Sequence, residues 1–289
     1  MTAWLKFLFR FYPFVSGQNE TANLTLVRKI LEGAGDAPRK ASFKKFSILA
    51  RLNDRHGRCA FLFGCNDGKV RDVFKRLVRP GDTVLDMGAN YGMYSLLSCG
   101  LAGPSGQVHA FEANPDLAEL MRESAKINGF DNLTVHAAAL SDHEGKANLY
   151  VPMRDSGLAS LSDQGSGQAR AVEVPLKETG PYLESLSLGP IKLLKSDLED
   201  HDFAVLSSAR SVLEKNPPAC ILFECHTVAV PFWESDLVEL LSSLGYEEFY
   251  SVPRTFFKTR LVKQARGDNE TGLSRNFLAV HRTQKGKLP

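Results

Sequence analysis

The stretch TVLDMGANYGMYSLL at residues 83–97 is the strongest constraint on how this chain can fold. An apolar β-forming run ends at Asp86, and Gly88, Asn90 and Gly92 then lead into an apolar run of helix-forming composition. Glycines let the backbone approach a ligand closely, and a helix start offers unpaired N–H donors. The pattern predicts a strand, a glycine turn and a helix, with a ligand bound at the turn.

The acid before the turn narrows the choice of ligand. A dinucleotide pyrophosphate binds to backbone N–H groups of a Gly-x-Gly-x-x-Gly turn with no carboxylate beside it. The carboxylate of Asp86 would repel a phosphate, whereas it could pair with the ammonium of a methionine moiety. The turn therefore favours S-adenosylmethionine over a dinucleotide, and a tight crossover that binds nothing is the plain structural alternative.

Two further acids follow predicted strands. Glu112 ends the strand 107–111, where its carboxylate could accept hydrogen bonds from both hydroxyls of an adenosine ribose. Asp142 follows the strand 133–138 and could accept from an adenine amino group, although the run Asp-His-Glu-Gly is also ordinary turn chemistry. Asn114 before a proline is typical of a helix N-cap, so we expect its role to be structural.

Alternating β-type and helical runs predict an α/β fold with ligands at the carboxyl ends of the strands. Core strands are expected at 191–194 and 220–223, with final strands at 247–252 and 276–281. Acids would then gather at five successive strand ends: Asp86, Glu112, Asp142, Asp197 and Glu224.

Residues 1–80 read as an N-terminal cap, and residues 81–289 as the ligand-binding domain. In the cap we expect an aromatic helix within residues 4–15, a β-hairpin from 46–52 and 59–63, and a helix over 69–78. The aromatic run is too short to span a bilayer and lacks the marks of a signal peptide. Two interpretations are open: the helix packs on the domain or on a partner subunit, or it holds the protein at a membrane surface.

Two loops are candidates for substrate contacts. The insertion at about 145–176 contains two short β runs around a polar loop at 154–170, and loops of this length often bind ligands or act as lids. Basic residues at 254–266 form either a solvated loop or a clamp for an anionic acceptor. The sequence does not decide between these two interpretations.

Composition excludes several classes of protein. The formal net charge is +2, which gives no sign of a nucleic-acid partner. The five cysteines contain no Cys-x-x-Cys pair, so neither a disulfide framework nor a zinc site is indicated, and a reducing cytoplasm fits best. No transmembrane segment is expected, and a homo-oligomer is compatible with the sequence.

The motifs together resemble the FkbM family of methyltransferases over roughly residues 64–226, and more loosely to 281. The stretches that carry the resemblance are VLDMGANYGMYSLL, VHAFEANP, LTVHAAALSDHEGKANLYV, IKLLKSDLED and ILFECH. The resemblance implies a Rossmann-like class I methyltransferase sheet, mostly parallel, with seven strands, an antiparallel last strand and helices on both faces. It implies S-adenosylmethionine as methyl donor and a hydroxyl acceptor on a sugar, glycoconjugate or polyketide-type small molecule.

The resemblance also implies residue roles. It assigns the cofactor to Asp86, Gly88, Asn90, Gly92, Glu112 and Asp142. It places the following residues toward the acceptor: Lys195, Asp197, Glu199, Glu224 and His226.

An alcohol acceptor must lose its proton, and Asp197, Glu199 and His226 are the candidate general bases. A lower-ranked alternative has Asp197, Glu199 and Glu224 bind Mg²⁺, which would lower the pKa of the acceptor hydroxyl. Asp200 stands where the family pattern has glycine, so acceptor choice and activity are less certain than cofactor binding. A methyltransferase-like binding protein without activity and a dinucleotide oxidoreductase are the rival functions.

Overall fold

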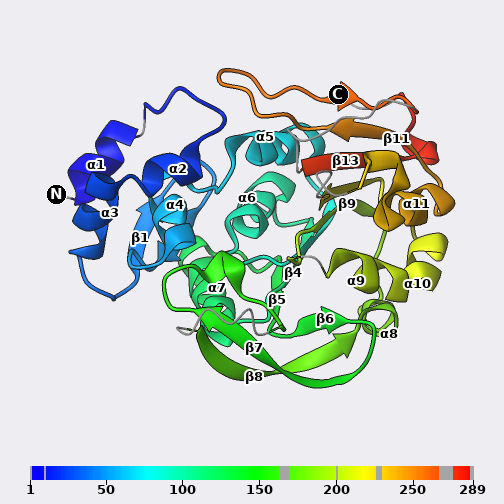
Figure 1. Ribbon diagram of the computed structural model, residues 1–289, viewed down its shortest axis with the longest axis horizontal. Coiled ribbons are helices and arrows are strands. Elements are labelled where there is room, and N and C mark those ends of the chain that lie inside the picture. The colour runs from blue at the N-terminus through cyan, green and yellow to red at the C-terminus, as the bar shows by residue number, and fades with distance from the viewer. Residues whose placement is uncertain are drawn as a thin grey trace.

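The computed structural model describes residues 2–9, 11–162, 169–199, 201–225, 230–266 and 276–286, apart from the side chain of Ala3 (Figure 1). Its centre is an eight-stranded sheet with the order β12-β11-β13-β10-β9-β3-β4-β5. The strands are β3 (Thr83–Met87), β4 (Gln107–Phe111), β5 (Leu133–His136), β9 (Ile191–Ser196), β10 (Cys220–Glu224), β11 (Tyr246–Ser251), β12 (Val262–Lys263) and β13 (Asn276–His281).

The strand directions confirm the predicted fold class. Strands β10, β9, β3, β4 and β5 pair in parallel, and β13 is antiparallel to both of its neighbours. The two-residue strand β12 adds an eighth member at the edge beyond β11. Chain order reverses between β3 and β9, the switch point at which open α/β sheets bind ligands.

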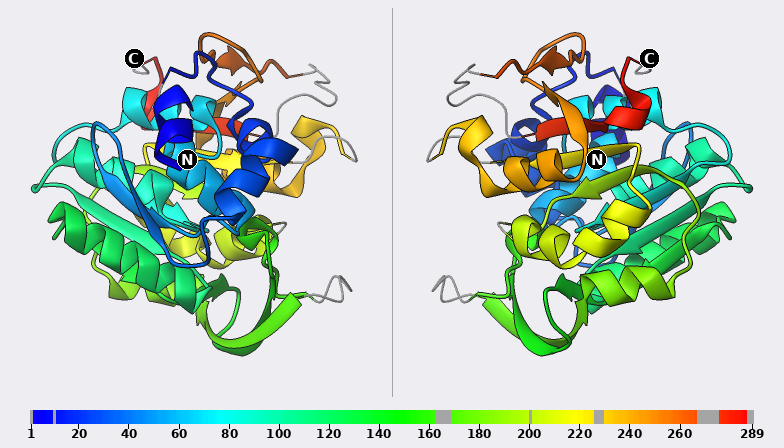
Figure 2. Two further views of the ribbon diagram at one scale, coloured as in Figure 1. Left: turned by 90° about the vertical axis from the view of Figure 1, so that its left-hand side faces the viewer. Right: turned by 90° about the vertical axis from the view of Figure 1, so that its right-hand side faces the viewer.

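Helices cover both faces because neighbouring residues of the central strands are buried on opposite sides (Figure 2). On one side Val84 and Leu193 belong to the core beneath α5 (Gly68–Leu77), α6 (Met93–Ala102) and α7 (Pro115–Asn128). On the other side Leu85 and Leu194 belong to the core beneath the remaining helices. These are α8 (Thr179–Ser185), α9 (Asp202–Ser208), α10 (Arg210–Lys215) and α11 (Asp236–Ser243).

The cap at the N-terminal end packs on the first of these cores. It contains α1 (Thr2–Phe9), α2 (Gln18–Ala22), α3 (Thr25–Glu32), the hairpin β1 (Arg39–Ser42) with β2 (Ser47–Ala50), and α4 (Arg55–Phe63). In the described part of the chain, no helix combines the length and apolar character needed to cross a bilayer.

The predicted strand at 59–63 is wrong, since these residues form the second half of α4. Asp54 caps the start of this helix by accepting from Gly57 N at 2.7 Å, and Gly64 ends it in the left-handed conformation. The run is buried on all sides, and a short apolar run of this kind fits a buried strand as well as a buried helix.

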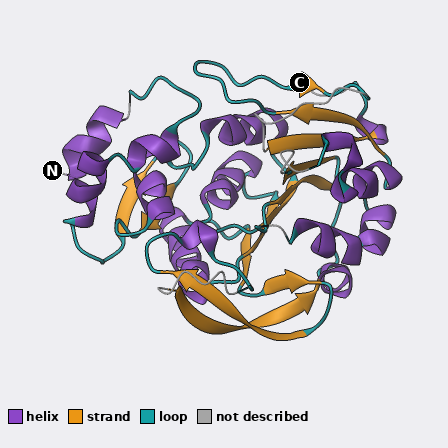
Figure 3. Cartoon of the chain, in the orientation of Figure 1, coloured by secondary structure: helices purple, strands orange, loops and turns teal. Residues whose placement is uncertain are grey.

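The predicted insertion forms a separate three-stranded sheet in the order β6-β8-β7 (Figure 3). Its strands are β6 (Ala139–Ser141), β7 (Gly145–Pro152) and β8 (Ala169–Glu178), and the 3-10 turn η1 (Ser156–Leu158) lies between the last two. The run predicted as one strand at 133–138 instead ends at His136, and the chain then turns into β6. Short 3-10 turns η2 (Phe232–Glu234) and η3 (Arg282–Gln284) lie near the C-terminal strands.

Candidate functional site

A cavity of about 400 Å³ lies at the carboxyl ends of the central strands, and we call it the central cavity. Its walls come from the sheet edge, from residues 138–140, from the loop at 156–162, and from His56 and Asn66 of the cap region. Six of the predicted site residues line it: Gly88, Asn90, Glu112, Asp197, Glu199 and Glu224.

The glycine turn has the backbone conformation that its sequence predicts. Gly88 has φ +74°, and a Cβ there would collide with the backbone carbonyl of Asp197. Asn90 also lies in the left-handed region at φ +52°, and its Oδ1 accepts from Tyr91 N at 2.8 Å. The turn is therefore held against β9 without room for a side chain at Gly88.

Gly92, which the resemblance assigns to the cofactor, packs against a neighbouring helix. It precedes α6 with φ +75°, and a Cβ at this position would lie 2.6 Å from the Met121 side chain of α7. Gly92 does not line the central cavity. The absence of a side chain at Gly92 allows the start of α6 to pack closely against α7.

Glu112 lies at the tip of β4 and reaches the turn. Its two carboxylate oxygens accept from Asn90 N at 2.7 Å and from Asn114 N at 2.8 Å. Burial raises the pKa of Glu112 to about 7, although these two hydrogen bonds oppose the shift. Each carboxylate oxygen can accept more than one hydrogen bond, so Glu112 keeps acceptor capacity toward the cavity that it lines.

Asp86 is fully buried beneath the turn and does not line the cavity. It is the fourth residue of β3 rather than the residue after it, so its side chain stays inside the sheet layer. Ser95 Oγ donates to its Oδ2 at 2.5 Å, and Lys195 Nζ lies 3.4 Å from its Oδ1. Its negative charge is thus balanced within the protein.

Lys195 joins Asp86 to the cavity wall. Its Nζ lies 3.2 Å from Asp197 Oδ2 and donates to the backbone carbonyls of Met87 and Gly88 at 3.4 and 3.3 Å. Burial alone would lower the pKa of Lys195, but the carboxylates of Asp197 and Asp86 outweigh it and raise the pKa. For Asp197, burial acts to raise the pKa, but the Lys195 ammonium outweighs it and lowers the pKa.

Asp142 does not reach the central cavity. The turn into β6 carries it onto the surface, where its side chain is 59% exposed and accepts from His143 Nδ1 at 2.7 Å. That hydrogen bond, followed by one from Ser141, lowers the pKa of Asp142. The predicted contact with an adenine amino group is therefore corrected, and Ala138, Ala139 and Leu140 line the cavity in its place.

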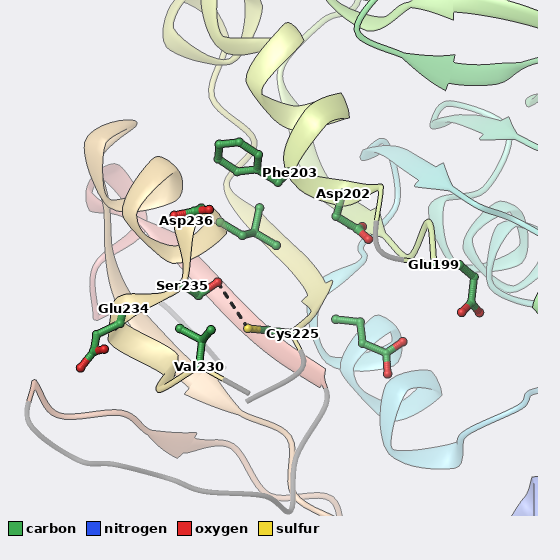
Figure 4. A pocket seen from close by; sticks show the side chains of 10 residues that line it. Glu199, Asp202, Phe203, Cys225, Val230, Glu234, Ser235 and Asp236 are labelled. Atoms are coloured by element: carbon green, nitrogen blue, oxygen red, sulfur yellow. Dashed lines mark hydrogen bonds between the residues drawn. The ribbon is translucent and has the colours of Figure 1, made fainter. Parts of the chain in front are cut away.

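Two more of the predicted acceptor residues border the same spaces. Glu199 and Glu224 both line the central cavity, and Glu199 has φ +48°. Both also border a smaller cleft between α9 and α11, in which Cys225 Sγ donates to Ser235 Oγ at 3.6 Å (Figure 4). His226 and Asp200 lie outside the described residues, so the predictions about them stay predictions.

His56 is a cavity residue that the sequence analysis missed. It follows Asp54, the N-cap of α4, and its Nδ1 lies 3.7 Å from Asp155 Oδ1. Burial lowers the pKa of His56 even though Asp54 and Asp155 act to raise it. A Cβ on Gly157 would overlap the His56 ring, so a glycine in the loop is what allows the imidazole to lie there. No motif marked this residue, because its partner is a hundred residues away in sequence.

Hydrogen bonds of Asp54 connect the cap with the loop at 156–162 and, through Ser156, with Asn90 of the glycine turn. Its carboxylate accepts from Ser156 N at 2.7 Å and from Ser156 Oγ at 3.0 Å, and Asn90 Nδ2 donates to the same Oγ at 3.3 Å. The predicted binding loop at 154–170 therefore does contribute to the cavity wall through its residues 156–162. Residues 163–168 lie outside the described part.

A second cavity of about 520 Å³, the cap cavity, lies between the cap and the sheet. It shares Asn66, Asp197 and Glu224 with the central cavity, so these three side chains stand between the two spaces. Most of its lining residues are polar. The carboxylates and amides are Glu20, Asp67, Asp197, Glu224, Asn19, Asn66 and Asn276.

The Mg²⁺ alternative finds no support. Among the described residues, no three side chains of His, Cys, Asp or Glu are grouped so that they could hold a metal ion.

Comparison with known proteins gives short matches to curated sequences. The chain is 41% identical over 58 residues to a protein-L-isoaspartate O-methyltransferase of Ignicoccus hospitalis, covering 20% of this chain and 28% of that protein. A second such enzyme, of Aeropyrum pernix, is 44% identical over 52 residues, covering 18% of this chain and 20% of that protein. The chain thus matches less than a third of the length of these relatives.

Solved structures show distant likeness in fold. A methyltransferase FkbM from Methylobacillus flagellatus aligns with 12% identity and a TM-score of 0.41 over 78% of this chain and 54% of that one. A SAM-dependent methyltransferase from Agrobacterium tumefaciens aligns with 12% identity and a TM-score of 0.46 over 85% of this chain and 70% of that one.

The family model described as methyltransferase FkbM domain matches residues 86–249, which is more than half of the 289 residues. The matched segment runs from β3 to β11 and includes all of the predicted site residues. This chain belongs to the FkbM methyltransferase family.

Proposed function

We propose that this protein transfers a methyl group from S-adenosylmethionine to a hydroxyl group of a polyhydroxylated acceptor, such as a sugar or glycoconjugate. The observation that carries the proposal is the position of Glu112, which lines the central cavity while fixing the glycine turn through Asn90. A carboxylate at this position suits the two hydroxyls of a ribose.

The central cavity fits the cofactor in charge and in size. S-adenosylmethionine carries a sulfonium and an ammonium, and the cavity wall carries the carboxyl groups of Asp197, Glu199 and Glu224. Its volume of about 400 Å³ lies in the range of small-molecule sites. Asn66 Oδ1 is buried there without a hydrogen-bond partner in the described structure, so it is an acceptor suited to an ammonium donor.

Asp86 would act on the cofactor indirectly. Because its carboxylate is engaged by Ser95 and Lys195, it holds Lys195 in place, and Lys195 in turn holds Asp197 at the cavity wall. Direct pairing of the ammonium with Asp197 is then favoured over pairing with Asp86.

The cap cavity is the proposed acceptor site. It borders the central cavity at Asp197 and Glu224, and its carboxylates and amides suit the many hydroxyls of a sugar. The bound cofactor would supply an electrophilic methyl group. The cavity walls would hold the acceptor oxygen in line with it, and such positioning is worth on the order of 7–11 kcal/mol of the barrier.

His56 is the general base that we favour among the described residues. Asp197 is a weak base because the Lys195 ammonium lowers its pKa. His56 has a lowered pKa for a different reason, burial, which keeps its imidazole neutral and able to take a proton. Asp155 near Nδ1 would stabilise the imidazolium once the proton has moved.

A cytoplasmic location fits the five cysteines, all of which are free thiols buried in the fold.

The proposal is tested by calorimetric titration of S-adenosylmethionine and of NAD into the purified protein and into a Glu112→Ala variant. Binding of S-adenosylmethionine that is lost in the variant, with no binding of NAD, supports it. Binding of NAD instead would favour the oxidoreductase. Cofactor binding without methyl transfer to any sugar or lipid-linked glycan in a broad panel would favour the inactive binding protein.

A further inference from the structure

The α1 helix exposes an apolar stripe instead of burying it. Trp4, Phe7 and Leu8 lie on one face of α1, and Phe11 follows in the turn after the helix; each of the four is between 45% and 70% exposed. The side of α1 that faces the protein is apolar as well, since Leu5 is buried and the Phe9 ring packs 5.6 Å from that of Phe63. A helix that exposes several large apolar side chains on its outer side is a candidate for contact with an apolar partner.

Two more exposed rings lie in the loop after β11. Phe256 and Phe257 are 67% and 75% exposed. Phe14 contacts both rings at 5.8 and 5.5 Å, and Val15 N donates to Phe256 O at 2.7 Å. The segment after α1 and this loop therefore run side by side, at the top of Figure 1.

Ring contacts connect the two groups. Phe9 lies 6.5 Å from Tyr12, and Tyr12 lies 5.4 Å from Phe14. We call the exposed members of this surface the aromatic ridge. They are Trp4, Phe7, Leu8, Phe11, Phe256 and Phe257.

The segment that carries Phe256 and Phe257 is basic. Residues 254–266 hold five Lys or Arg and no Asp or Glu, although the whole chain has a net charge of only +2. Lys258 and Arg260, next to the two exposed phenylalanines, are exposed and form no ion pair with any described residue. Aromatic side chains flanked by Lys and Arg match the boundary between acyl chains and anionic headgroups. Contact between the ridges of two copies of the chain would bring these positive charges together, so a second copy is a less favourable partner than an anionic bilayer.

The ridge adjoins the mouth of the cap cavity. Ser16, Gly17 and Glu20 line that cavity directly after Phe14 in sequence, and Arg254 lines it two residues before Phe256. Arg254 Nη1 forms an ion pair with Glu20 Oε1 at 2.7 Å across this edge. A bilayer in contact with the ridge would therefore lie beside the proposed acceptor site.

We propose that the aromatic ridge binds an anionic bilayer surface and that the methyl acceptor is the polyhydroxylated headgroup of a membrane-anchored lipid. The acceptor part rests on the proposed function, whereas bilayer binding does not. The ridge holds the protein at the interface, and the cap cavity receives the headgroup while its acyl chains stay in the bilayer.

The first test is flotation of the full chain with vesicles of phosphatidylcholine alone and with vesicles of equal parts phosphatidylcholine and phosphatidylglycerol. Binding to the anionic vesicles is expected to weaken at least about tenfold in a Phe256→Ser, Phe257→Ser variant, because the substitutions remove two apolar rings that would otherwise be buried in the bilayer. Ile127→Ser, which alters an exposed apolar residue of α7, is the matched control and keeps full binding. Light scattering of the same samples in solution measures the oligomeric state.

No binding by the unaltered protein, or equal binding by the ridge variant, would overturn the proposal. So would a dimer that the ridge substitutions dissociate, because the ridge would then be a contact between copies. Circular dichroism spectra and thermal unfolding curves like those of the unaltered protein show that both variants are folded.

The second test follows labelled methyl groups from S-adenosylmethionine into a cell extract separated into organic and aqueous phases. Label in the organic phase supports a lipid-anchored acceptor, and label confined to the aqueous phase refutes it. No label in either phase counts against the proposed function itself, while the flotation result still decides the bilayer contact.

Discussion

The ammonium nitrogen of Lys195 lies 3.4 Å from Oδ1 of Asp86, and the two residues are register partners on the adjacent parallel strands β9 and β3. Both side chains are buried. The strand that precedes the glycine turn and the strand that leads to Asp197 are thus joined by a buried ion pair. This pair explains how the charge of Asp86 is accommodated although the residue does not line the cavity.

Breaking the pair should cost stability. Lys195→Met leaves the Asp86 carboxylate buried without its partner charge, and we expect a loss of about 3–5 kcal/mol in the free energy of unfolding. Urea denaturation followed by circular dichroism measures this change. Lys146→Met removes a solvent-exposed partner of Glu173 and should leave the free energy of unfolding nearly unchanged. Equal losses in the two variants would show that the buried pair is not structural.

Gly88 should tolerate no side chain, for a steric reason beyond its φ angle. Gly129 has a similar φ of +66° with open space where a Cβ would lie, whereas a Cβ on Gly88 meets the Asp197 carbonyl. Gly129→Ala should therefore cost about 1–2 kcal/mol from backbone strain alone, and Gly88→Ala clearly more. Thermal unfolding of both variants compares them. Similar melting temperatures would mean that the turn relaxes away from β9.

The sequence predicted the elements whose signals are local. The strand, turn and helix around Gly88 and the N-cap at Asn114 form as expected, because short-range periodicity and turn chemistry specify them. The prediction placed Asp142 at the end of a strand of the main sheet. In the structure β6 instead pairs with β8, more than thirty residues further along the chain, so the residues before Asp142 belong to a separate sheet.

Long-range packing also explains the other differences. His56 reaches the cavity because α4 begins at Arg55, where the predicted hairpin had its turn before the strand at 59–63. A loop a hundred residues later also brings Gly157 and Asp155 against its ring. Neither pairing leaves a local pattern in the sequence. The glycine turn of this chain is therefore predictable from sequence, whereas the cap side of the central cavity is not.

Cofactor affinity should increase with pH through the titration of Glu112. A carboxylate accepts two ribose hydroxyls better than a carboxylic acid does, and its pKa in the free protein is about 7. Between about pH 6 and pH 8 the ionised fraction rises roughly tenfold, and the dissociation constant of S-adenosylmethionine should fall by about that factor. Titration calorimetry across this range measures it.

Glu112→Gln is the control variant, because glutamine has nearly the shape of glutamate but no carboxyl group that titrates. Its affinity should be lower and nearly constant with pH. An unchanged pH dependence in Glu112→Gln would assign the effect to another group.

Replacement of His56 should slow methyl transfer more than it weakens binding. His56→Gln removes the proposed base, so we expect kcat to fall by about 10²–10⁴ with little change in the dissociation constant of S-adenosylmethionine. His143→Gln alters an exposed histidine outside the cavity and should leave kcat unchanged. Single-turnover rates on an acceptor found in the panel provide the measurement. If His56→Gln retains full activity, the base lies elsewhere, with Glu199 and Glu224 the next candidates.

Stability in mild acid should depend on His136. Its Nδ1 is hydrogen-bonded with Tyr182 Oη at 2.8 Å, and its ring stacks on Phe111 with centroids 4.5 Å apart. Burial, followed by the neighbouring His109 and Arg122, lowers the pKa of His136 from 6.5 to about 4. As pH falls from 6.5 toward 4, His136 therefore becomes protonated in the unfolded chain but stays neutral in the folded chain. The free energy of unfolding should drop across this window by on the order of 2–3 kcal/mol. Above pH 6.5 the contribution is constant, because the ring is neutral in both states. Urea denaturation at several pH values should show this slope for the native protein and a shallower one for His136→Gln. A slope of equal size in the variant would mean that other buried groups, and not the histidine at the end of β5, set the acid sensitivity of the fold.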